Sequence, residues 1–248
     1  SDVCSSDLLI FCHQNSHINV AECNAPEFFT GGAKLVGLEG SQGKINISAL
    51  EGKIQYYRSL RPHLSNPATI SLTQLTEIGT IYTLNELHSI QEIAARCNLS
   101  LHMDGARFAN AVAFLGGTVA ELTWKSGVDI LSFGLTKNGG LITEMVLFFG
   151  DKFANYIDFL HKRAGQLIAK SRFLAVQFIA LLQNSLWIEN ALNSNKMAVQ
   201  ISEIIKTLPN CSVIYPVQGN LVFAKLTPTI AHKLQAEGAD FYPWDFPD

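Results

Sequence analysis

An acidic and a basic side chain follow two neighbouring strands of the predicted sheet. Asp104 comes directly after the apolar residues 100–103, and Lys137 follows the apolar residues 128–133. The interval between them is about the length of one βαβ unit, in which two parallel strands lie side by side. Ligands of open parallel sheets bind at the carboxyl ends of the strands. We therefore expect the carboxylate and the amine to face one crevice.

This pair of side chains suits pyridoxal 5′-phosphate (PLP). PLP needs a lysine that forms a Schiff base with its aldehyde, and an acid that keeps its pyridine nitrogen protonated. The lysine must be neutral to attack the aldehyde, which requires a desolvated or cation-flanked position. In the alternative interpretation, Lys137 is a solvated loop lysine and Asp104 caps the helix that follows it. Spacing alone leaves both interpretations open.

Two stretches of sequence around these residues are specific in combination. Residues 101–111 read LHMDGARFANA, and residues 129–139 read DILSFGLTKNG. Together they closely resemble the threonine aldolase and aromatic amino acid β-eliminating lyase family, whose members use PLP and have the type I fold of PLP-dependent enzymes. The resemblance extends over nearly the whole chain and includes shorter stretches at residues 16–22, 25–31, 163–167 and 218–223.

The resemblance implies catalytic roles for three side chains. Lys137 corresponds to the Schiff-base lysine, and Asp104 to the partner of the pyridinium nitrogen. His17 corresponds to an imidazole that stacks on the cofactor ring, and it is also a candidate base for the β-hydroxyl group of a substrate. His13 and His17 are spaced as in a metal-binding helix, but no Glu follows the first His, so we expect no metal site.

Three further residues are implied to bind the cofactor or the substrate. Arg107 corresponds to an arginine that holds the phenolic oxygen of the cofactor or the substrate carboxylate, although a pair with a surface acid is the alternative. Thr136 is a candidate phosphate ligand, although a threonine in a turn usually bonds the local backbone. Arg172 corresponds more loosely to an arginine of the family that contacts a phosphate or the substrate, and this contact could cross a subunit interface.

The chain departs from the family pattern at three points. The Gly-Thr phosphate loop of the family would precede His17, where this chain has only sixteen residues and no Gly-Thr pair, and the Arg-Leu-Val stretch of the family would follow Asp248. One branch of the family has a Thr-His pair where this chain has Thr76 and Glu77, which leaves the identity of the base open. We therefore expect a chain cut at both ends, which by itself is poorly soluble or binds PLP weakly, and which cleaves no threonine measurably.

The resemblance implies an aldolase that cleaves β-hydroxy-α-amino acids, such as threonine or allo-threonine, to glycine and an aldehyde. The alternatives are a β-eliminating lyase, another PLP enzyme that acts on amino acids, or an inactive fragment of such an enzyme. The fold class is α/β. We expect a large PLP-binding domain with a mainly parallel sheet in residues 1–165, and interdomain helices with part of a small α+β domain in residues 166–248.

Composition excludes several classes of protein. The chain has 18 Lys and Arg against 21 Asp and Glu, and this charge of −3 argues against a nucleic-acid partner. No apolar run reaches the roughly 18 residues of a membrane helix. Five cysteines without a Cys-x-x-Cys pair, and no signal peptide, indicate reduced thiols and a cytoplasmic location. The expected partners are a small amino-acid substrate and further copies of the chain, as a homodimer or homotetramer.

Hydrophobic periodicity predicts alternating strands and helices. Strands are expected at residues 8–12, 33–38, 68–73, 100–103, 128–133, 145–149, 213–215 and 221–226. Helices are expected at residues 48–57, 85–98, 106–115, 118–125, 231–237 and over most of 152–208. The helix at 48–57 is expected to begin with Ser48 as its N-cap.

Overall fold

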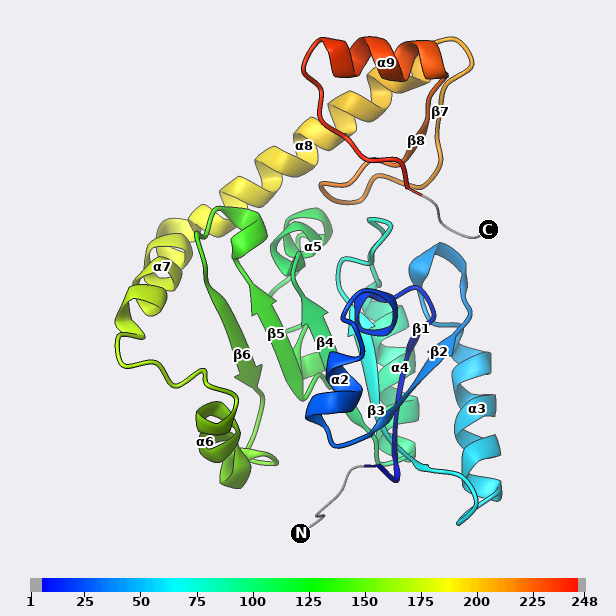
Figure 1. Cartoon of the computed structure of the whole chain (residues 1–248), viewed down its shortest axis with the longest axis vertical. Coiled ribbons are helices and arrows are strands. Elements are labelled where there is room, and N and C mark those ends of the chain that lie inside the picture. The colour runs from blue at the N-terminus through cyan, green and yellow to red at the C-terminus, as the bar shows by residue number, and fades with distance from the viewer. Residues whose placement is uncertain (1–5, 245–248) are drawn as a thin grey trace.

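A six-stranded sheet lies at the centre of the protein, for which the computed structural model describes residues 6–244 (Figure 1). Its strands are β1 (Leu8–His13), β2 (Lys34–Leu38), β3 (Asn66–Thr73), β4 (Ser100–Gly105), β5 (Ile130–Gly134) and β6 (Glu144–Phe148). The strand order is β2-β1-β3-β4-β5-β6, and only the β5–β6 pair of this sheet is antiparallel. The expected mainly parallel sheet is confirmed.

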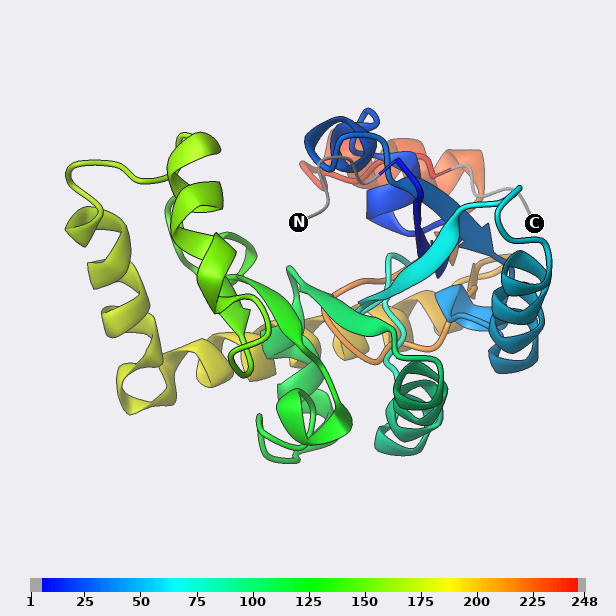
Figure 2. The ribbon, with the colours of Figure 1, turned by 90° about the horizontal axis from the view of Figure 1, so that it is seen from below.

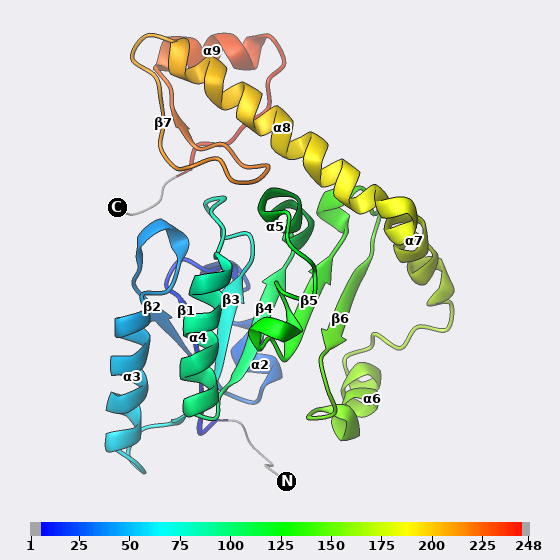
Figure 3. The same cartoon turned by 180° about the vertical axis from the view of Figure 1, so that it is seen from behind.

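Helices cover the two faces of this sheet unequally. The helices α3 (Ile47–Ser59), α4 (Leu84–Arg96) and α5 (Phe108–Leu115) pack on one face (Figure 3). The short α1 (His17–Val20) and α2 (Ala25–Phe29) lie on the other side of the sheet (Figure 2). Because side chains alternate between the faces of a strand, one face of the sheet presents buried apolar side chains to α3–α5, including Ile70, Leu72, Leu101, Met103, Leu131 and Phe133.

The opposite face of the central strands carries polar side chains. The imidazole of His102 on β4 lies between two serines, with Nδ1 2.9 Å from Ser71 Oγ and Nε2 3.0 Å from Ser132 Oγ. Burial lowers the pKa of His102, against the opposing charges of Asp104 and Glu22. The neutral ring therefore joins β3, β4 and β5 by side-chain hydrogen bonds, two residues before Asp104.

The second part of the chain is mostly helical, as expected. After α6 (Ala154–Arg163) and α7 (Arg172–Leu182), the long α8 (Leu186–Thr207) runs past the carboxyl edge of the sheet, and it ends beside a small two-stranded sheet (Figure 1). That small sheet consists of β7 (Ser212–Val213) and β8 (Ala224–Lys225), and α9 (Pro228–Ala236) follows it. The domain boundary between residues 165 and 166 stays a prediction; it falls in the segment between α6 and α7. Among residues 6–244, none of the helices combines the length and the apolar composition that crossing a bilayer requires.

The prediction of a helix at residues 118–125 is wrong. Thr118 and Glu121 do form a reciprocal capping arrangement, in which Thr118 Oγ1 donates to Glu121 Oε2 at 2.7 Å and the backbone N–H of Glu121 donates to Thr118 Oγ1 at 3.2 Å. The helical turn stops at Thr123, whose backbone (φ −128°, ψ −108°) is not helical. A short 3₁₀ helix, η2 (Trp124–Ser126), and Gly127 with φ +77° then turn the chain into β5. The sequence pattern of residues 118–125 did not reveal that this helical turn ends at Thr123.

Asn46 caps α3, and the expected Ser48 cap is wrong because Ser48 lies inside the first turn. Asn46 Oδ1 accepts a hydrogen bond from the backbone N–H of Ala49 at 2.9 Å. We predict that Asn46→Ala lowers the free energy of unfolding by about 1 kcal/mol, the usual cost of losing such a cap. The matched control, Ser48→Ala, should change it by less than about 0.5 kcal/mol. Urea unfolding followed by circular dichroism measures both; a larger loss for Ser48→Ala would contradict the assignment.

Candidate active site

Asp104 lies at the carboxyl end of β4, where it pairs in register with Ser132 of β5. Its Oδ1 accepts a hydrogen bond from the backbone N–H of Ala106 at 2.9 Å. This bond closes a local turn and does not cap a helix, because α5 begins only at Phe108. The alternative reading of Asp104 as a helix cap is therefore not realised, and the carboxylate stays at the edge of the sheet.

Lys137 lies on a 3₁₀ turn, η3 (Thr136–Asn138), that directly follows β5. Its side chain is exposed, and its Nζ makes no hydrogen bond or ion pair with any residue of the described range 6–244. The turn itself is firmly held: the buried Asn138 donates from Nδ2 to the carbonyl of Trp187 at 2.7 Å, and Asn190 Nδ2 donates to the carbonyl of Asn138 at 3.1 Å. The amine therefore projects from a fixed backbone and is not committed to another group.

Parallel pairing of β4 with β5 brings Asp104 and Lys137 to the same edge of the sheet. Thr136, beside Lys137, makes only long contacts with the backbone of Thr143, at 3.5 Å to its carbonyl and 3.4 Å to its N–H. Hydrogen bonds of this length are weak. The hydroxyl of Thr136 thus faces the local backbone, as the alternative interpretation holds, and its role toward a phosphate stays a prediction.

His17 opens the short helix α1 four residues after the end of β1. Its Nδ1 donates to Glu22 Oε1 at 2.9 Å, and the side chain is half-exposed. His13 is engaged elsewhere, with Nε2 3.2 Å from the carbonyl of Gly40 and Nδ1 accepting from the backbone N–H of Asn15 at 3.2 Å. Sequence reasoning missed the partnership of His17 with Glu22, although both residues lie in the stretch 16–22.

Glu77 is a second residue of this region whose position the sequence did not reveal. It lies in the loop after β3, and its Oε1 accepts two hydrogen bonds, from the backbone N–H of His17 at 2.7 Å and from Thr73 Oγ1 at 2.9 Å. Burial raises the pKa of the Glu77 carboxyl above its ordinary value, and the negative charge of Asp104 acts in the same direction. The structure therefore gathers His17, Glu77 and Asp104 at one end of the sheet.

Arg107 lies between β4 and α5, close enough to Asp104 and Glu77 for both carboxylates to affect it electrostatically. Burial lowers the pKa of Arg107, and the two negative charges oppose that shift. Its Nε is buried and has no hydrogen-bond partner within the part of the chain that the structure describes. Because an unsatisfied buried donor is costly, this nitrogen indicates a place where an acidic group of a ligand would bind.

Arg172 is not brought into contact with the other candidate residues. It is the first residue of α7, and its guanidinium lies 5.6 Å from the ring centre of Phe173 on the surface. The connection to the Lys137 turn is indirect, since Thr143 Oγ1 donates to the carbonyl of Leu174 at 3.2 Å. A role for Arg172 at a subunit interface stays a prediction.

The segment between β7 and β8 closes over the loop that carries Glu77. Gln218 Oε1 accepts from the backbone N–H of Ile81 at 2.9 Å. Gly219 approaches so closely that a Cβ there would lie 2.0 Å from Leu75 Cδ1, so a larger residue would force the two segments apart. The next side chain, Asn220, has a buried Oδ1 with no hydrogen-bond partner among the described residues. A second unsatisfied polar atom thus lies beside this loop.

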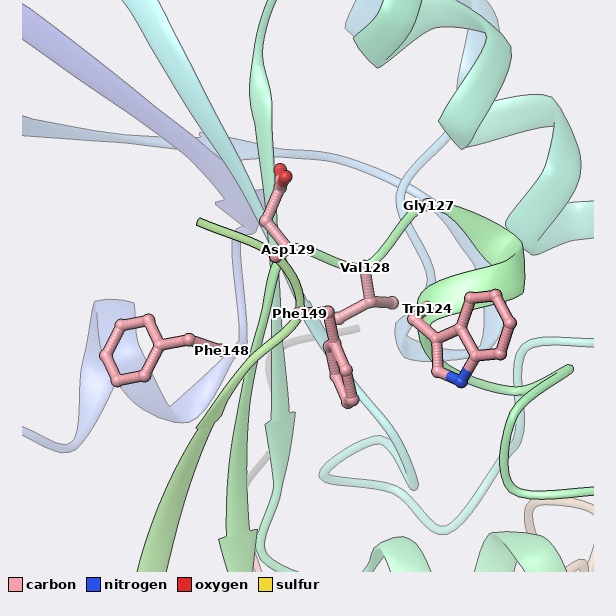
Figure 4. Close-up of a pocket in the computed structure, with 7 residues that line it drawn as sticks. Trp124, Gly127, Val128, Asp129, Phe148 and Phe149 are labelled. Carbon is pink, nitrogen blue, oxygen red and sulfur yellow. The ribbon is translucent and has the colours of Figure 1, made fainter. Parts of the chain in front are cut away.

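A separate pocket of about 610 Å³ lies where the chain enters β5 (Figure 4). Trp124, Val128 and Phe149 line it, together with Asp129, which immediately precedes β5. Asp129 precedes β5 and Lys137 follows it, so the pocket and the candidate site lie at opposite ends of this strand. The carboxylate of Asp129 already has a hydrogen-bond partner, since its Oδ2 accepts from the backbone N–H of Leu101 at 2.8 Å.

Comparison with known proteins gives the family. A family model described as β-eliminating lyase matches residues 2–227. The chain belongs to this family. The resemblance inferred from residues 101–111 and 129–139 is thereby confirmed, as is the expectation of a lyase.

Relatives of the lyase family agree with this assignment. The low-specificity L-threonine aldolase of Pseudomonas aeruginosa is 40% identical over 240 residues, which are 97% of this chain and 69% of that protein. The enzyme of the same name from Pseudomonas sp. strain NCIMB 10558 is 38% identical over 242 residues, 98% of this chain and 69% of that protein. The chain thus spans about two thirds of the length of these relatives.

A solved structure confirms the expected fold class. The threonine aldolase of Leishmania major superposes with a TM-score of 0.86 at 27% sequence identity, covering 94% of this chain and 66% of that one. The chain therefore has the type I α/β fold of PLP-dependent enzymes, with the mainly parallel sheet that the resemblance implied.

Proposed function

We propose that this protein cleaves β-hydroxy-α-amino acids, with threonine and allo-threonine as the leading substrates, to glycine and an aldehyde, and that PLP is its cofactor. The observation that carries the proposal is that Asp104 and the uncommitted amine of Lys137 lie at the same carboxyl edge of the sheet. Relatives at 38% and 40% identity that are named low-specificity L-threonine aldolases support the choice of substrate.

The residues present fit PLP. Lys137 offers an amine without a partner in the described residues, Asp104 offers a carboxylate for the pyridine nitrogen, and Arg107 offers a buried Nε that lacks an acceptor. His17 begins α1, after strand β1, which β3 separates from β4, and its ring would cover the cofactor. When bound, PLP withdraws the electron pair left on the α-carbon of the substrate.

The remaining chemistry depends on side chains of this protein. Asp104 would hold a proton on the pyridine nitrogen by its negative charge. Arg107 would orient an acidic oxygen of the ligand by a charge-assisted hydrogen bond. Glu22, through its bond to Nδ1, fixes the direction of the His17 ring, so that the ring is oriented before the ligand arrives.

A β-eliminating lyase is the second candidate, because the family model carries that description. Elimination would release ammonia and a keto acid, whereas aldol cleavage releases glycine and an aldehyde. Analysis of the products therefore separates the two reactions on the same protein.

The proposed function predicts that the full-length protein, purified with PLP, releases acetaldehyde from threonine. Oxidation of NADH by added alcohol dehydrogenase measures the aldehyde, and amino-acid analysis measures glycine in equal amount. Protein freed of PLP should be inactive and should recover when PLP is returned. Formation of ammonia without glycine would replace this function by elimination, and absence of both products would overturn it.

We further propose that the protein acts in the cytoplasm as a homodimer or homotetramer. Large apolar side chains are exposed along α6, α7 and the segment between them, among them Phe159 (68% exposed), Ile168 (46%), Phe173 (61%) and Ile179 (59%). Extended apolar surface of this kind favours protein–protein contact. Cys12, Cys23, Cys97 and Cys211 are free thiols, which suits a reducing compartment, and Cys4 lies outside the described residues.

A further inference from the structure

Glu77 is held in one orientation at the candidate site. Its Oε1 accepts hydrogen bonds from two directions, one from the main chain of α1 through His17 and one from Thr73 at the end of β3. Both bonds are made to Oε1, and together they fix the orientation of the carboxylate. One oxygen therefore anchors the group, and the other remains able to take a proton.

The surroundings of Glu77 match those of a base. It lies within electrostatic reach of both Asp104 and Arg107, the residues assigned to the cofactor and to an acidic group of the ligand. His17, the other candidate base, has its Nδ1 bound to Glu22. A carboxylate that only capped the first turn of α1 would not need to lie beside Asp104, because the like charge there is unfavourable.

We propose that Glu77 binds the β-hydroxyl group of the substrate and accepts its proton during cleavage, an inference that rests on the aldolase function proposed above. The hydroxyl O–H bond breaks, and its proton moves to Glu77 Oε2. The electron pair of that bond forms the second carbon–oxygen bond of the aldehyde while the Cα–Cβ bond breaks. The α-carbon keeps the pair of the broken bond and takes up a proton to give glycine, and Glu77 returns its proton to water. No oxidant or reductant is required.

The charge environment sets the direction of the pH dependence. Burial raises the pKa of Glu77, so its active, ionised form should disappear as the pH falls through a range above that of an ordinary glutamate. The groups that interact with this carboxylate come from four parts of the chain: Cys12, His17, Tyr82, Asp104 and Arg107. If the loss of kcat/KM at low pH is caused by protonation of Glu77, this loss must disappear when Glu77 alone is replaced by a neutral residue.

The substitution Glu77→Gln separates the chemical role from the structural one. The amide oxygen can still accept from His17 and Thr73, so the fold and the helix start are kept, but the side chain can no longer take a proton. We expect kcat for threonine to fall about 100-fold or more, as for the loss of a general base, and the acid limb of kcat/KM to disappear. Exchange of the α-hydrogen of glycine, which has no hydroxyl group, should stay within about threefold of the unsubstituted protein.

Glu51→Gln is the matched control, because Glu51 is a carboxylate of α3 that pairs with the exposed Arg96 at 2.6 Å, away from the site. Its threonine cleavage should be unchanged. Unimpaired cleavage by Glu77→Gln, or an equal loss of cleavage and of glycine exchange, would overturn the inference while leaving the aldolase function standing. If the unsubstituted protein cleaves no threonine, the proposed function itself fails.

A spectroscopic readout does not depend on turnover. In protein labelled with ¹³C at the glutamate carboxyl carbon, the resonance of Glu77 is the one that Glu77→Gln removes. Adding L-serine, which has a β-hydroxyl group, should shift this resonance, whereas L-alanine should not. The same response to both amino acids would show that Glu77 does not meet the hydroxyl group, and would overturn the inference.

Discussion

Borohydride reduction of the PLP-loaded protein should leave a pyridoxyl group on Lys137, and Lys137→Ala should lower kcat for threonine by about 10⁴-fold or more. The loss is large because this amine is the only one proposed to bind the cofactor covalently, and loss of a covalent catalytic group removes most of the rate enhancement. The fixed turn supports the assignment, since Asn138 and Asn190 hold its backbone to α8. Peptide mass mapping and the acetaldehyde assay measure the two effects.

Lys125→Ala is the control for this prediction. Lys125 is an exposed lysine of η2 at the opposite edge of the sheet, with its Nζ 5.5 Å from the ring centre of Trp124. Its substitution should leave kcat within about twofold, as for surface changes away from the site. A pyridoxyl group on any lysine other than Lys137 would refute the assignment.

Asp104→Asn should retain PLP but lower kcat by about 10²–10³-fold, which corresponds to about 2.7–4 kcal/mol of transition-state stabilisation. The neutral amide cannot favour the protonated pyridine nitrogen by charge. It can still accept the hydrogen bond from Ala106, so the turn at the end of β4 is kept. Steady-state kinetics with threonine and the absorbance of bound PLP measure the two properties.

Asp129→Asn provides the comparison for Asp104. Asp129 is also a half-buried carboxylate that bonds a backbone N–H, that of Leu101, but it lies at the other end of β5. Its substitution should leave kcat nearly unchanged. If the two variants lose the same activity, Asp104 acts through the stability of the sheet and not through the cofactor.

The sequence predicted the positions of those site residues that directly follow a recognisable strand. Asp104 and Lys137 each follow an apolar strand, so periodicity and the order of elements were enough to bring them to one edge. The bond between Glu77 and His17 joins the loop after β3 to the start of α1, 60 residues apart in the chain. It depends on β1 lying beside β3, and no local pattern carries that information.

The errors in the predicted elements have similar causes. Ser48 and Asn46 are both good capping residues, and only the position of the first helical turn decides between them. The strands predicted at residues 213–215 and 221–226 are reduced to two residues each, β7 and β8. Apolar residues there indicated extended chain correctly, but the extent of backbone pairing depends on the neighbouring segment.

The helix α8 and the segment that follows it are attached to the rest of the protein at two places. Asn190 holds this helix to the Lys137 turn, and Ser194 and Asn195 hold it to Asn110 of α5. Beyond these points the helix continues through residues 196–207, roughly 18 Å at 1.5 Å per residue. The segment that follows, between β7 and β8, returns to the sheet, where Gln218 accepts a hydrogen bond from the backbone N–H of Ile81. Residues 190–218 thus connect the turn that carries Lys137 to the loop that carries Glu77 by a route outside the sheet, and this second connection restricts the movement of the two groups relative to each other.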